Sequence, residues 1–296
     1  MITTFKQVVI RHEDGTYGKA YDYVGNFFDG YAAVKLDHKV GFIDENGKEI
    51  CPIKYDRVLI FQNGLARVKL NGNWGLINEQ GEEIIFPKYN CILELTDGYY
   101  TVNLDDKIGV VNEKGEEVIP PKYDQIYDAE DGFFKYQLNN KYGVLNEKGE
   151  EIISPKYDYI WDFKDGIAKV KNDDKFGIIN SKGEEIIPLK YDGINEFENH
   201  FAVVKLRGKY GFIDETGKEI TEIKYDMAYD FNNEFAVIIL DRKQGLINEK
   251  GEEIISPKYD YIYEFEKGFA KVRLNGRQGI INEIGEEVVP PVLKDN

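Results

Sequence analysis

The sequence predicts an all-β protein built as a tandem array of eight 34-residue β-hairpin/meander repeats. Three series of residues carry this prediction, and each recurs at intervals of 34. The first glycine series is Gly41, Gly75, Gly109, Gly143, Gly177, Gly211, Gly245 and Gly279. The second glycine series is Gly47, Gly81, Gly115, Gly149, Gly183, Gly217, Gly251 and Gly285. The tyrosine series is Tyr21, Tyr55, Tyr89, Tyr123, Tyr157, Tyr191, Tyr225 and Tyr259. No insertion interrupts the copies, and a strict period of this size is the signature of a repeat architecture.

Within one repeat the apolar residues recur every two positions, which is typical of strands. In residues 268–274, GFAKVRL, the residues Ala270, Val272 and Leu274 share one face. The Asn-Gly pair at 275–276 predicts a two-residue hairpin turn, followed by a second strand (RQGII) and a third (EEVV). We expect proline to end the third strand, because it cannot donate a hydrogen bond to the sheet. Alternating aromatics at 259–265 predict a fourth extended segment, and no helical period occurs.

The repeated residues have structural roles. The glycines of the second series are expected in turns that need positive φ. Those of the first series lie inside a strand, where a missing side chain makes room for a bulge or a neighbouring aromatic ring. The residues that follow the tyrosines are expected to accept backbone N–H groups in the turn after the proline. They are Asp56, Asp124, Asp158, Asp192, Asp226 and Asp260, with Asn90 able to do the same.

Composition predicts a packed, acidic protein. Of 296 residues, 42% are hydrophobic and 31% charged, so a core can form. The net charge of −16 argues against nucleic acid and anionic membranes and favours basic partners. No linker is evident, so residues 21–292 are expected to form one continuous repeat domain. Residues 1–20 are predicted as a degenerate N-terminal cap unit, and 293–296 as a C-terminal tail.

Cysteine content and the N-terminal sequence indicate the compartment. Cys51 and Cys91 are the two cysteines. We expect reduced structural thiols, with a single disulfide as the alternative. The N-terminal residues lack the apolar core of a secretory signal, and no stretch is apolar enough to span a membrane. A cytoplasmic protein is therefore predicted, unless a signal sequence has been removed.

The consensus G-h-I-N-x-x-G-E-E-I-I-x-P-K-Y-D resembles the bacterial WG (KWG) repeat family. The similarity covers residues 21–292, although the Trp-Gly pair that names the family occurs only at Trp74–Gly75. The resemblance implies a β-rich repeat with no generally assigned activity.

Two architectures fit the repeat, and an open β-solenoid is favoured over an eight-bladed β-propeller. Eight whole repeats would fill a propeller. However, its crossover would span three strand spacings, about 14 Å, and the short SPKY link extends to roughly 13–17 Å at most. The degenerate sequence before residue 21 also suits the cap of an open array.

The sequence predicts no enzyme. The carboxylate pairs of the GEE turns recur in most copies, as solvated strand edges would, whereas a glycosidase needs two carboxylates flanking one bond. The DENG segment at 44–47 lacks the remaining ligands of a calcium loop. The three histidines have no zinc-site spacing, and no nucleophile elbow or phosphate loop occurs. No catalytic residue, cofactor or metal is therefore predicted.

The most variable positions follow each Tyr-Asp pair and predict an interaction surface. In an array, aromatic and acidic residues at these positions would align as a ridge. The ridge consists of Tyr127, Asp128, Tyr159, Trp161, Asp162, Tyr229, Asp230, Tyr261, Tyr263 and Glu264. Aromatic residues are favoured as interface anchors. The predicted function is therefore a non-catalytic scaffold that binds a protein partner, with a carbohydrate-binding module as the alternative. An enzyme is the third and least favoured function. For the aromatics themselves, the alternative to an interaction surface is that they only fill the junctions between neighbouring repeats.

Overall fold

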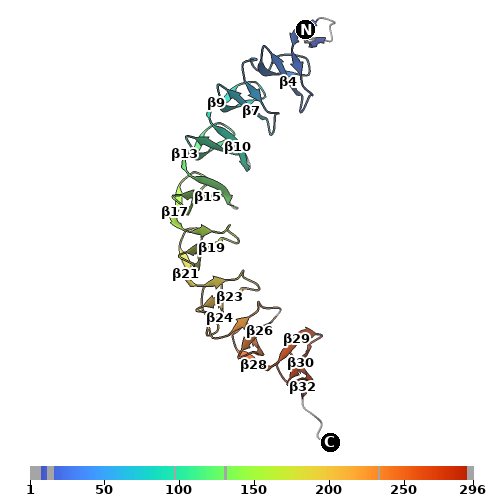
Figure 1. The fold of residues 1–296 in the computed structure, drawn as a ribbon, viewed down its shortest axis with the longest axis vertical. Coiled ribbons are helices and arrows are strands. Elements are labelled where there is room, and N and C mark those ends of the chain that lie inside the picture. Colours follow the sequence, from blue (N-terminus) through green and yellow to red (C-terminus); the bar gives the residue numbers. More distant parts are fainter. Residues whose placement is uncertain (1–7, 12–16, 97, 130–131, 233, 292–296) are drawn as a thin grey trace, which may run out of the picture. The chain divides into compact units, whose positions relative to one another are not determined.

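The structure is a computed structural model that describes residues 8–11, 17–96, 98–129, 132–232 and 234–291. The chain forms two compact units, Met1–Pro155 and Lys156–Asn296. All regular elements of the described residues are strands, in sheets that follow one another along the chain within each unit (Figure 1). The all-β tandem array is therefore confirmed.

The described residues of the first unit form sixteen strands and most of a seventeenth. They are β1 (Val8–Arg11), β2 (Tyr17–Tyr21), β3 (Tyr23–Val24), β4 (Tyr31–Leu36), β5 (Lys39–Asp44), β6 (Arg57–Val58), β7 (Leu65–Leu70), β8 (Asn73–Asn78), β9 (Glu83–Tyr89), β10 (Cys91–Thr96), β11 (Tyr99–Leu104), β12 (Lys107–Asn112), β13 (Glu117–Tyr123), β14 (Gln125–Ala129), β15 (Phe133–Leu138), β16 (Lys141–Asn146) and β17 (Glu151–Tyr157).

The second unit contains the remaining strands. They are β18 (Tyr159–Ile160), β19 (Ile167–Asn172), β20 (Lys175–Asn180), β21 (Glu185–Tyr191), β22 (Gly193–Ile194), β23 (Phe201–Leu206), β24 (Lys209–Asp214), β25 (Met227–Ala228), β26 (Phe235–Leu240), β27 (Lys243–Asn248), β28 (Glu253–Tyr259), β29 (Tyr261–Glu266), β30 (Phe269–Leu274), β31 (Arg277–Asn282) and β32 (Glu287–Val289).

Each repeat is one antiparallel meander whose strands pair in chain order, as in β29-β30-β31-β32. Leu274 faces Arg277 across the hairpin between β30 and β31. The two turn residues, Asn275 and Gly276, have φ of 50° and 79°. The Asn-Gly hairpin is therefore confirmed, because this turn needs positive φ at both positions.

The expectation that proline ends the third strand is confirmed only in the last repeat, where β32 stops before Pro290. It is wrong for β9, β13, β17, β21 and β28, which all continue through a proline. In β28, Ile255 faces Leu246 and Tyr259 faces Gln244, so the residues between form a bulge opposite Gly245. A Cβ atom on Gly245 would lie 2.4 Å from the carbonyl oxygen of Ile255. The strand glycine therefore makes room for the proline bulge. The aromatic segment that follows is extended, as predicted, and is the first strand of the next sheet.

Two repeats have three strands, β3-β4-β5 and β22-β23-β24, because a side chain replaces a main-chain acceptor. Thr221 Oγ1 accepts the N–H of Phe212 at 3.0 Å, and the N–H of Ile220 donates to the carbonyl oxygen of Phe212. Cys51 accepts the N–H of Phe42 in the same way in the first repeat. The regular ladder is lost at these positions, and isolated bridges replace the fourth strand.

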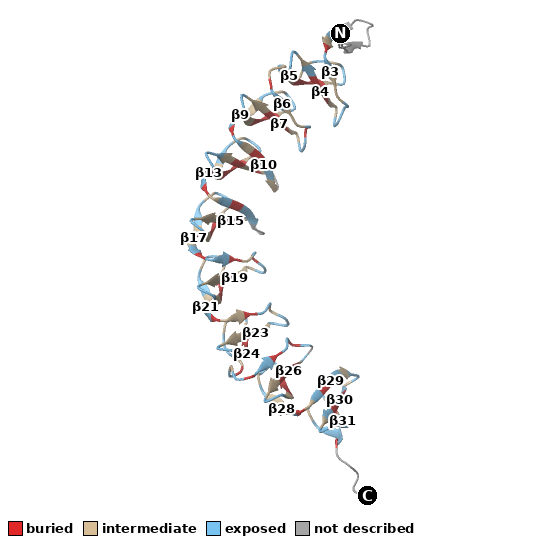
Figure 2. Cartoon of the chain, in the orientation of Figure 1, coloured by how far each residue is buried: buried red, intermediate tan, exposed pale blue. Residues whose placement is uncertain are grey.

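The hydrophobic core is divided into clusters between consecutive sheets. One cluster joins Leu246, Ile255 and Tyr259 of sheet β25–β28 to Ile262 and Val272 of sheet β29–β32. Most buried residues lie in short stretches of the strands, with exposed residues around them (Figure 2). Each sheet of a unit therefore packs mainly on its neighbours in sequence, as expected of repeat proteins.

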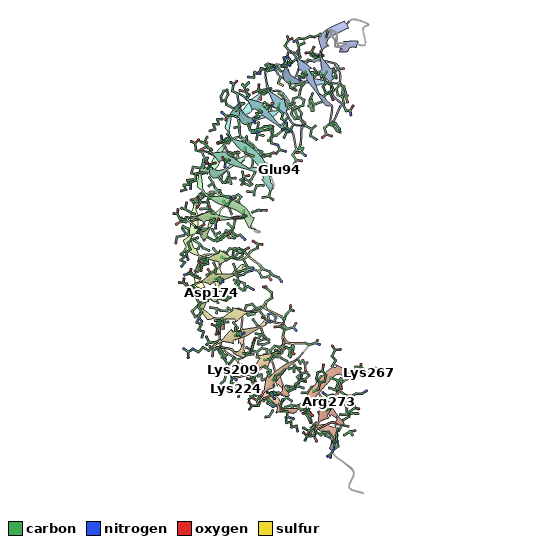
Figure 3. The ribbon with its side chains drawn as sticks, in the orientation of Figure 1. Glu94, Asp174, Lys209, Lys224, Lys267 and Arg273 are labelled. Atoms are coloured by element: carbon green, nitrogen blue, oxygen red, sulfur yellow. The ribbon has the colours of Figure 1, made fainter. Side chains whose placement is uncertain are left out.

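The aspartates after the tyrosine series hold a different turn from the one predicted. Asp226 Oδ2 accepts the N–H of Asp241, in the hairpin turn fifteen residues later, at 2.8 Å. Its Oδ1 pairs with Lys209 Nζ at 2.6 Å (Figure 3 labels Lys209). Asn90 accepts the N–H of Asp105 at 3.1 Å. The acceptor role is confirmed, and its predicted location after the proline is wrong.

The strands β1 and β2 pair as the last two strands of a repeat do. Val8 faces Tyr21, as Trp74 faces Tyr89 in the second repeat, with two residues fewer between them. Residues 1–7 and 12–16 of the predicted cap, Val292 and the predicted tail lie outside the described residues. The cap, the continuous domain and the open solenoid stay predictions.

Candidate interaction site

The ridge aromatics lie on the first strand of each sheet, where side chains alternate between two faces. On β29, Ile262 is buried, whereas Tyr261 is 43% exposed and Tyr263 is 39% exposed. The two tyrosine rings contact each other at a centroid distance of 4.7 Å. The strand period therefore places adjacent aromatics on one accessible face.

All ridge tyrosines are at least one-third exposed, and their neighbouring acids are exposed too. Tyr127, Tyr159 and Tyr229 have exposed fractions of 39%, 38% and 50%. The exposed acids are Asp128, Asp162, Asp230 and Glu264. Tyr127 and Asp128 belong to the first unit, and the other eight ridge residues belong to the second.

Trp161 is half-buried and packs inside its own sheet. Its ring contacts Tyr159 at a centroid distance of 4.7 Å and Phe176 at 5.8 Å. Lys169 Nζ lies 5.1 Å from the centre of the Trp161 ring, within the range of a cation–π interaction. Trp161 therefore contacts two aromatic rings and a lysine of its own repeat.

A groove runs between the fifth and sixth repeats, beside Trp161. We call it the filled groove, and it encloses about 150 Å³. Lys169 Nζ pairs with Glu196 Oε1 of the next repeat at 2.9 Å and donates to the carbonyl oxygen of Ile194 at 3.4 Å. The lysine side chain is only 17% exposed. An internal cation therefore occupies the space between an aromatic ring and a carboxylate.

The equivalent groove lies between the seventh and eighth repeats, two periods further on. We call it the open groove, and it encloses about 590 Å³. Its lining includes Tyr229 and Val237 from the seventh repeat and Glu264 from the eighth. These three residues correspond to Trp161, Lys169 and Glu196 of the filled groove, respectively. The two grooves therefore differ at the position of the lysine.

Sequence reasoning missed the residue eight positions after the ridge aromatics that share the repeat phase of Trp161. Lys135, Lys169 and Lys271 follow Tyr127, Trp161 and Tyr263 at this spacing, whereas Val237 follows Tyr229. Two further acids of the open groove, Glu234 and Glu283, were also missed. The sequence does show that the residue at the lysine position differs between copies. This difference can be interpreted only once the structure shows that the position lines a groove.

The carboxylate pairs are structural, but they are not simply solvated edges as predicted. In the repeat starting at β25, Asn248 Nδ2 donates to the first glutamate, Glu252, at 2.8 Å. The second glutamate, Glu253, accepts a hydrogen bond at 3.0 Å from Tyr225, which forms a bridge with Tyr210 of the preceding sheet. Lys224 pairs with the same carboxylate at 3.2 Å (Figure 3 labels Lys224). The second glutamate therefore connects neighbouring repeats.

The same connection shifts the pKa values of its members in other repeats. Hydrogen bonds from Lys88 and then Tyr89 lower the pKa of Glu117. Burial, followed by the hydrogen bond to Glu117, raises the pKa of Tyr89 to about 12. The glutamate is therefore held ionised and the tyrosine protonated near neutral pH, which suits a structural pair and not an acid–base pair.

The two cysteines and His200 belong to three different repeats. Cys51 and Cys91 are both free, and burial raises the pKa of the Cys51 thiol to about 11. His200 Nδ1 lies 3.0 Å from Glu215 Oε1 on the surface. In the described part of the chain, no group of three or more His, Cys, Asp or Glu side chains is arranged to hold a metal, and no helix could span a membrane.

Comparison with protein families gives one match that extends along the chain. A family model described as "WG containing repeat" matches eight segments, at residues 19–39, 41–74, 74–107, 108–142, 142–176, 176–210, 210–243 and 245–277. The segments follow the 34-residue period. No curated protein matches the chain.

Solved structures give only weak likenesses. The crystal structure of a eukaryotic initiation factor has a TM-score of 0.32 and 10% identity, covering 88% of this chain and 84% of that one. PorZ, from the type-IX secretion system of Porphyromonas gingivalis, has a TM-score of 0.27 and 9% identity, covering 84% and 41%. Hsv2p of Kluyveromyces lactis has a TM-score of 0.29 and 10% identity, covering 75% and 92%. Scores this low carry no argument.

Proposed function

Because the chain belongs to the WG repeat family, we propose that it is a non-catalytic repeat scaffold that binds a protein partner through the ridge. The observation that carries this proposal is the exposure of the ridge tyrosines, from 38% to 50%, in an array whose scaffold tyrosines are buried. Tyrosine offers a large, rigid contact area with a polar end, which suits interfaces.

Charge favours a basic partner. The acids beside the ridge aromatics are exposed, and the chain carries a net charge of −16. A field of one sign steers and selects partners of the opposite sign. The catalytic alternative has no such support, because the repeated carboxylates are engaged in holding turns and neighbouring repeats together.

The test is affinity capture from the source organism with the full chain and a variant that carries Tyr229→Ser, Tyr261→Ser and Tyr263→Ser. The control is Phe86→Ser, since Phe86 is 63% exposed but does not occupy a ridge position. We expect the wild type and the control to retain a protein that the triple variant loses, with melting temperatures nearly unchanged.

Recovery of the same proteins by the triple variant would refute the ridge. Binding of the wild type to immobilised oligosaccharides, lost in the triple variant while protein capture persists, would instead favour the carbohydrate-binding alternative.

A further inference from the structure

We infer that the open groove is a receptor for the side-chain cation of one lysine or arginine on a partner protein. This inference deepens the proposed function and rests on it. It follows from comparing equivalent positions within one chain, where some repeats supply the cation themselves and the seventh does not.

The filled groove shows how the repeat binds a cation. Lys169 lies over the Trp161 ring and pairs with Glu196 on the next repeat. A cation on an aromatic face and a charge-assisted hydrogen bond act on the same ammonium group. The fold therefore already contains a working cation site in this place.

The same place also accepts an arginine. Arg67, at the equivalent position of the second repeat, donates from Nη1 to the carbonyl oxygen of Ile92 at 3.3 Å. Lys169 donates to the equivalent carbonyl of Ile194. Glu94, the acid of that groove, accepts a hydrogen bond from Asn63 at 3.1 Å (Figure 3 labels Glu94). Within this chain, both a lysine and an arginine side chain therefore bind at this place in the repeat.

The open groove has the receptor groups without the cation. Tyr229 keeps the aromatic position and Glu264 keeps the acid, but Val237 replaces the lysine. Glu234 and Glu283 also line the groove, and its lining contains no lysine or arginine. Among the described residues, Glu264 has no hydrogen-bond or ion-pair partner. A carboxylate and an aromatic ring that line one groove without a lysine or arginine are complementary to a basic side chain.

The groove between the sixth and seventh repeats also has a valine at the lysine position, but there the acid has a hydrogen-bond partner within the chain. Val203 takes the lysine position in the sixth repeat, and Asn195 takes the aromatic position. Asn195 Nδ2 donates to Asp230 Oδ1 at 3.0 Å. Asp230 therefore has a hydrogen-bond partner within the chain. The seventh repeat differs, because it combines an aromatic residue and an acid with a valine in place of the lysine.

The size of the open groove agrees with an external ligand. Its volume of about 590 Å³ lies within the range of ligand pockets, whereas the 150 Å³ of the filled groove does not. Residues of β26 and β27 line the groove on one side and residues of β29 on the other. A side chain can therefore enter between two repeats.

The experiment titrates the full chain with capped pentapeptides of glycine that carry one central arginine, lysine or norleucine. Methyl NMR signals of Leu246 and Ile262, which both line the open groove, report binding. We expect the two basic peptides to shift these signals with millimolar affinity, as suits one side chain, and the norleucine peptide not to.

Two substitutions test the mechanism in opposite directions. Val237→Lys should fill the groove from within, as Lys169 does, and weaken binding about tenfold or more. Thr101→Lys is the matched control, since it adds the same charge at the equivalent position of the third repeat. Lys169→Val should empty the filled groove, so that methyl signals of Ile178 also respond to the basic peptides.

Equal binding by the wild type and Val237→Lys, or binding of norleucine as strong as that of arginine, would overturn the inference. The cation receptor and protein binding by the ridge can fail independently of each other. A protein captured by Val237→Lys but lost by the triple tyrosine variant would leave the scaffold standing without the cation receptor. If the basic peptides bind but no protein is captured, the cation receptor would stand and the protein-binding scaffold would not.

Discussion

Alanine at Gly251 should destabilise the protein far more than alanine at Gly276, although both glycines have nearly the same backbone conformation. Their φ values are 78° and 79°. Left-handed φ costs a residue with a Cβ atom about 1–2 kcal/mol. A Cβ atom on Gly276 would meet nothing within 4 Å, so this conformational cost is all we expect there.

At Gly251 a second cost arises from the preceding repeat. A Cβ atom would lie 2.0 Å from the carbonyl oxygen of Ile220, which is a backbone atom and cannot rotate away. Relieving such a contact requires a backbone shift between two repeats, and overpacking of this kind costs about 1–3 kcal/mol. Gly251→Ala should therefore lose roughly 2–5 kcal/mol in total, against about 1–2 kcal/mol for Gly276→Ala.

The assay is urea unfolding followed by circular dichroism, together with amide hydrogen exchange in β24 and β27. Repeat arrays can unfold in stages, so exchange shows where the loss occurs. We expect faster exchange in both strands for Gly251→Ala only. Equal effects of the two substitutions would refute the inter-repeat contact, and an unchanged Gly251→Ala would also refute the turn.

Three further predictions concern the connections between repeats and the array as a whole. Tyr89→Phe removes a 2.7 Å hydrogen bond to Glu117 and should cost about 1 kcal/mol in urea unfolding. Tyr123→Phe should be neutral, because its hydroxyl has no hydrogen-bond partner among the described residues. The pKa of Glu117 is lowered in the folded state, mainly by Lys88, so its contribution is complete above the unfolded pKa and is lost as pH falls through the folded pKa. Acid titration of stability should therefore show a loss that begins below about pH 4.5 and is smaller in Glu117→Gln; an identical profile in that variant would contradict the assignment. Deletion of residues 143–176 should leave a soluble, folded protein if the array is an open solenoid, and circular dichroism with size-exclusion chromatography checks this; only aggregate would favour a closed propeller.

Much of the fold could be predicted because the repeat displays its own constraints. The Asn275-Gly276 turn and the strand alternation depend on local backbone chemistry, which sequence reveals directly. The path of β28 through Pro257 could not be predicted, since the bulge depends on Gly245 of the neighbouring strand. The partner of Asp226 was missed for the same reason, because the hairpin turn it holds lies fifteen residues away.

The site was harder to predict than the fold. Exposure of Tyr261 and Tyr263 follows from strand alternation, but that pattern alone does not separate a surface aromatic from one that fills a junction. The open groove is defined by residues from two repeats, and its most informative member, Val237, is an ordinary strand residue. Its meaning depends on Lys169 at the equivalent position, which only the shared geometry makes comparable.

The bonds between repeats recur at fixed separations, 28 residues from Tyr89 to Glu117 and 17 from Lys107 to Asp124. A gene duplication of 34 codons therefore rebuilds every such bond across the new junction, wherever its breakpoints fall. Among the lysine–aspartate pairs, the exception lies where Asn73 and Asn90 together replace the lysine and aspartate. A duplication of residues 80–113 would place Lys107 opposite a second copy of Asn90 and leave it without its carboxylate. Mismatched pairs of this kind would record where recombination has cut the array.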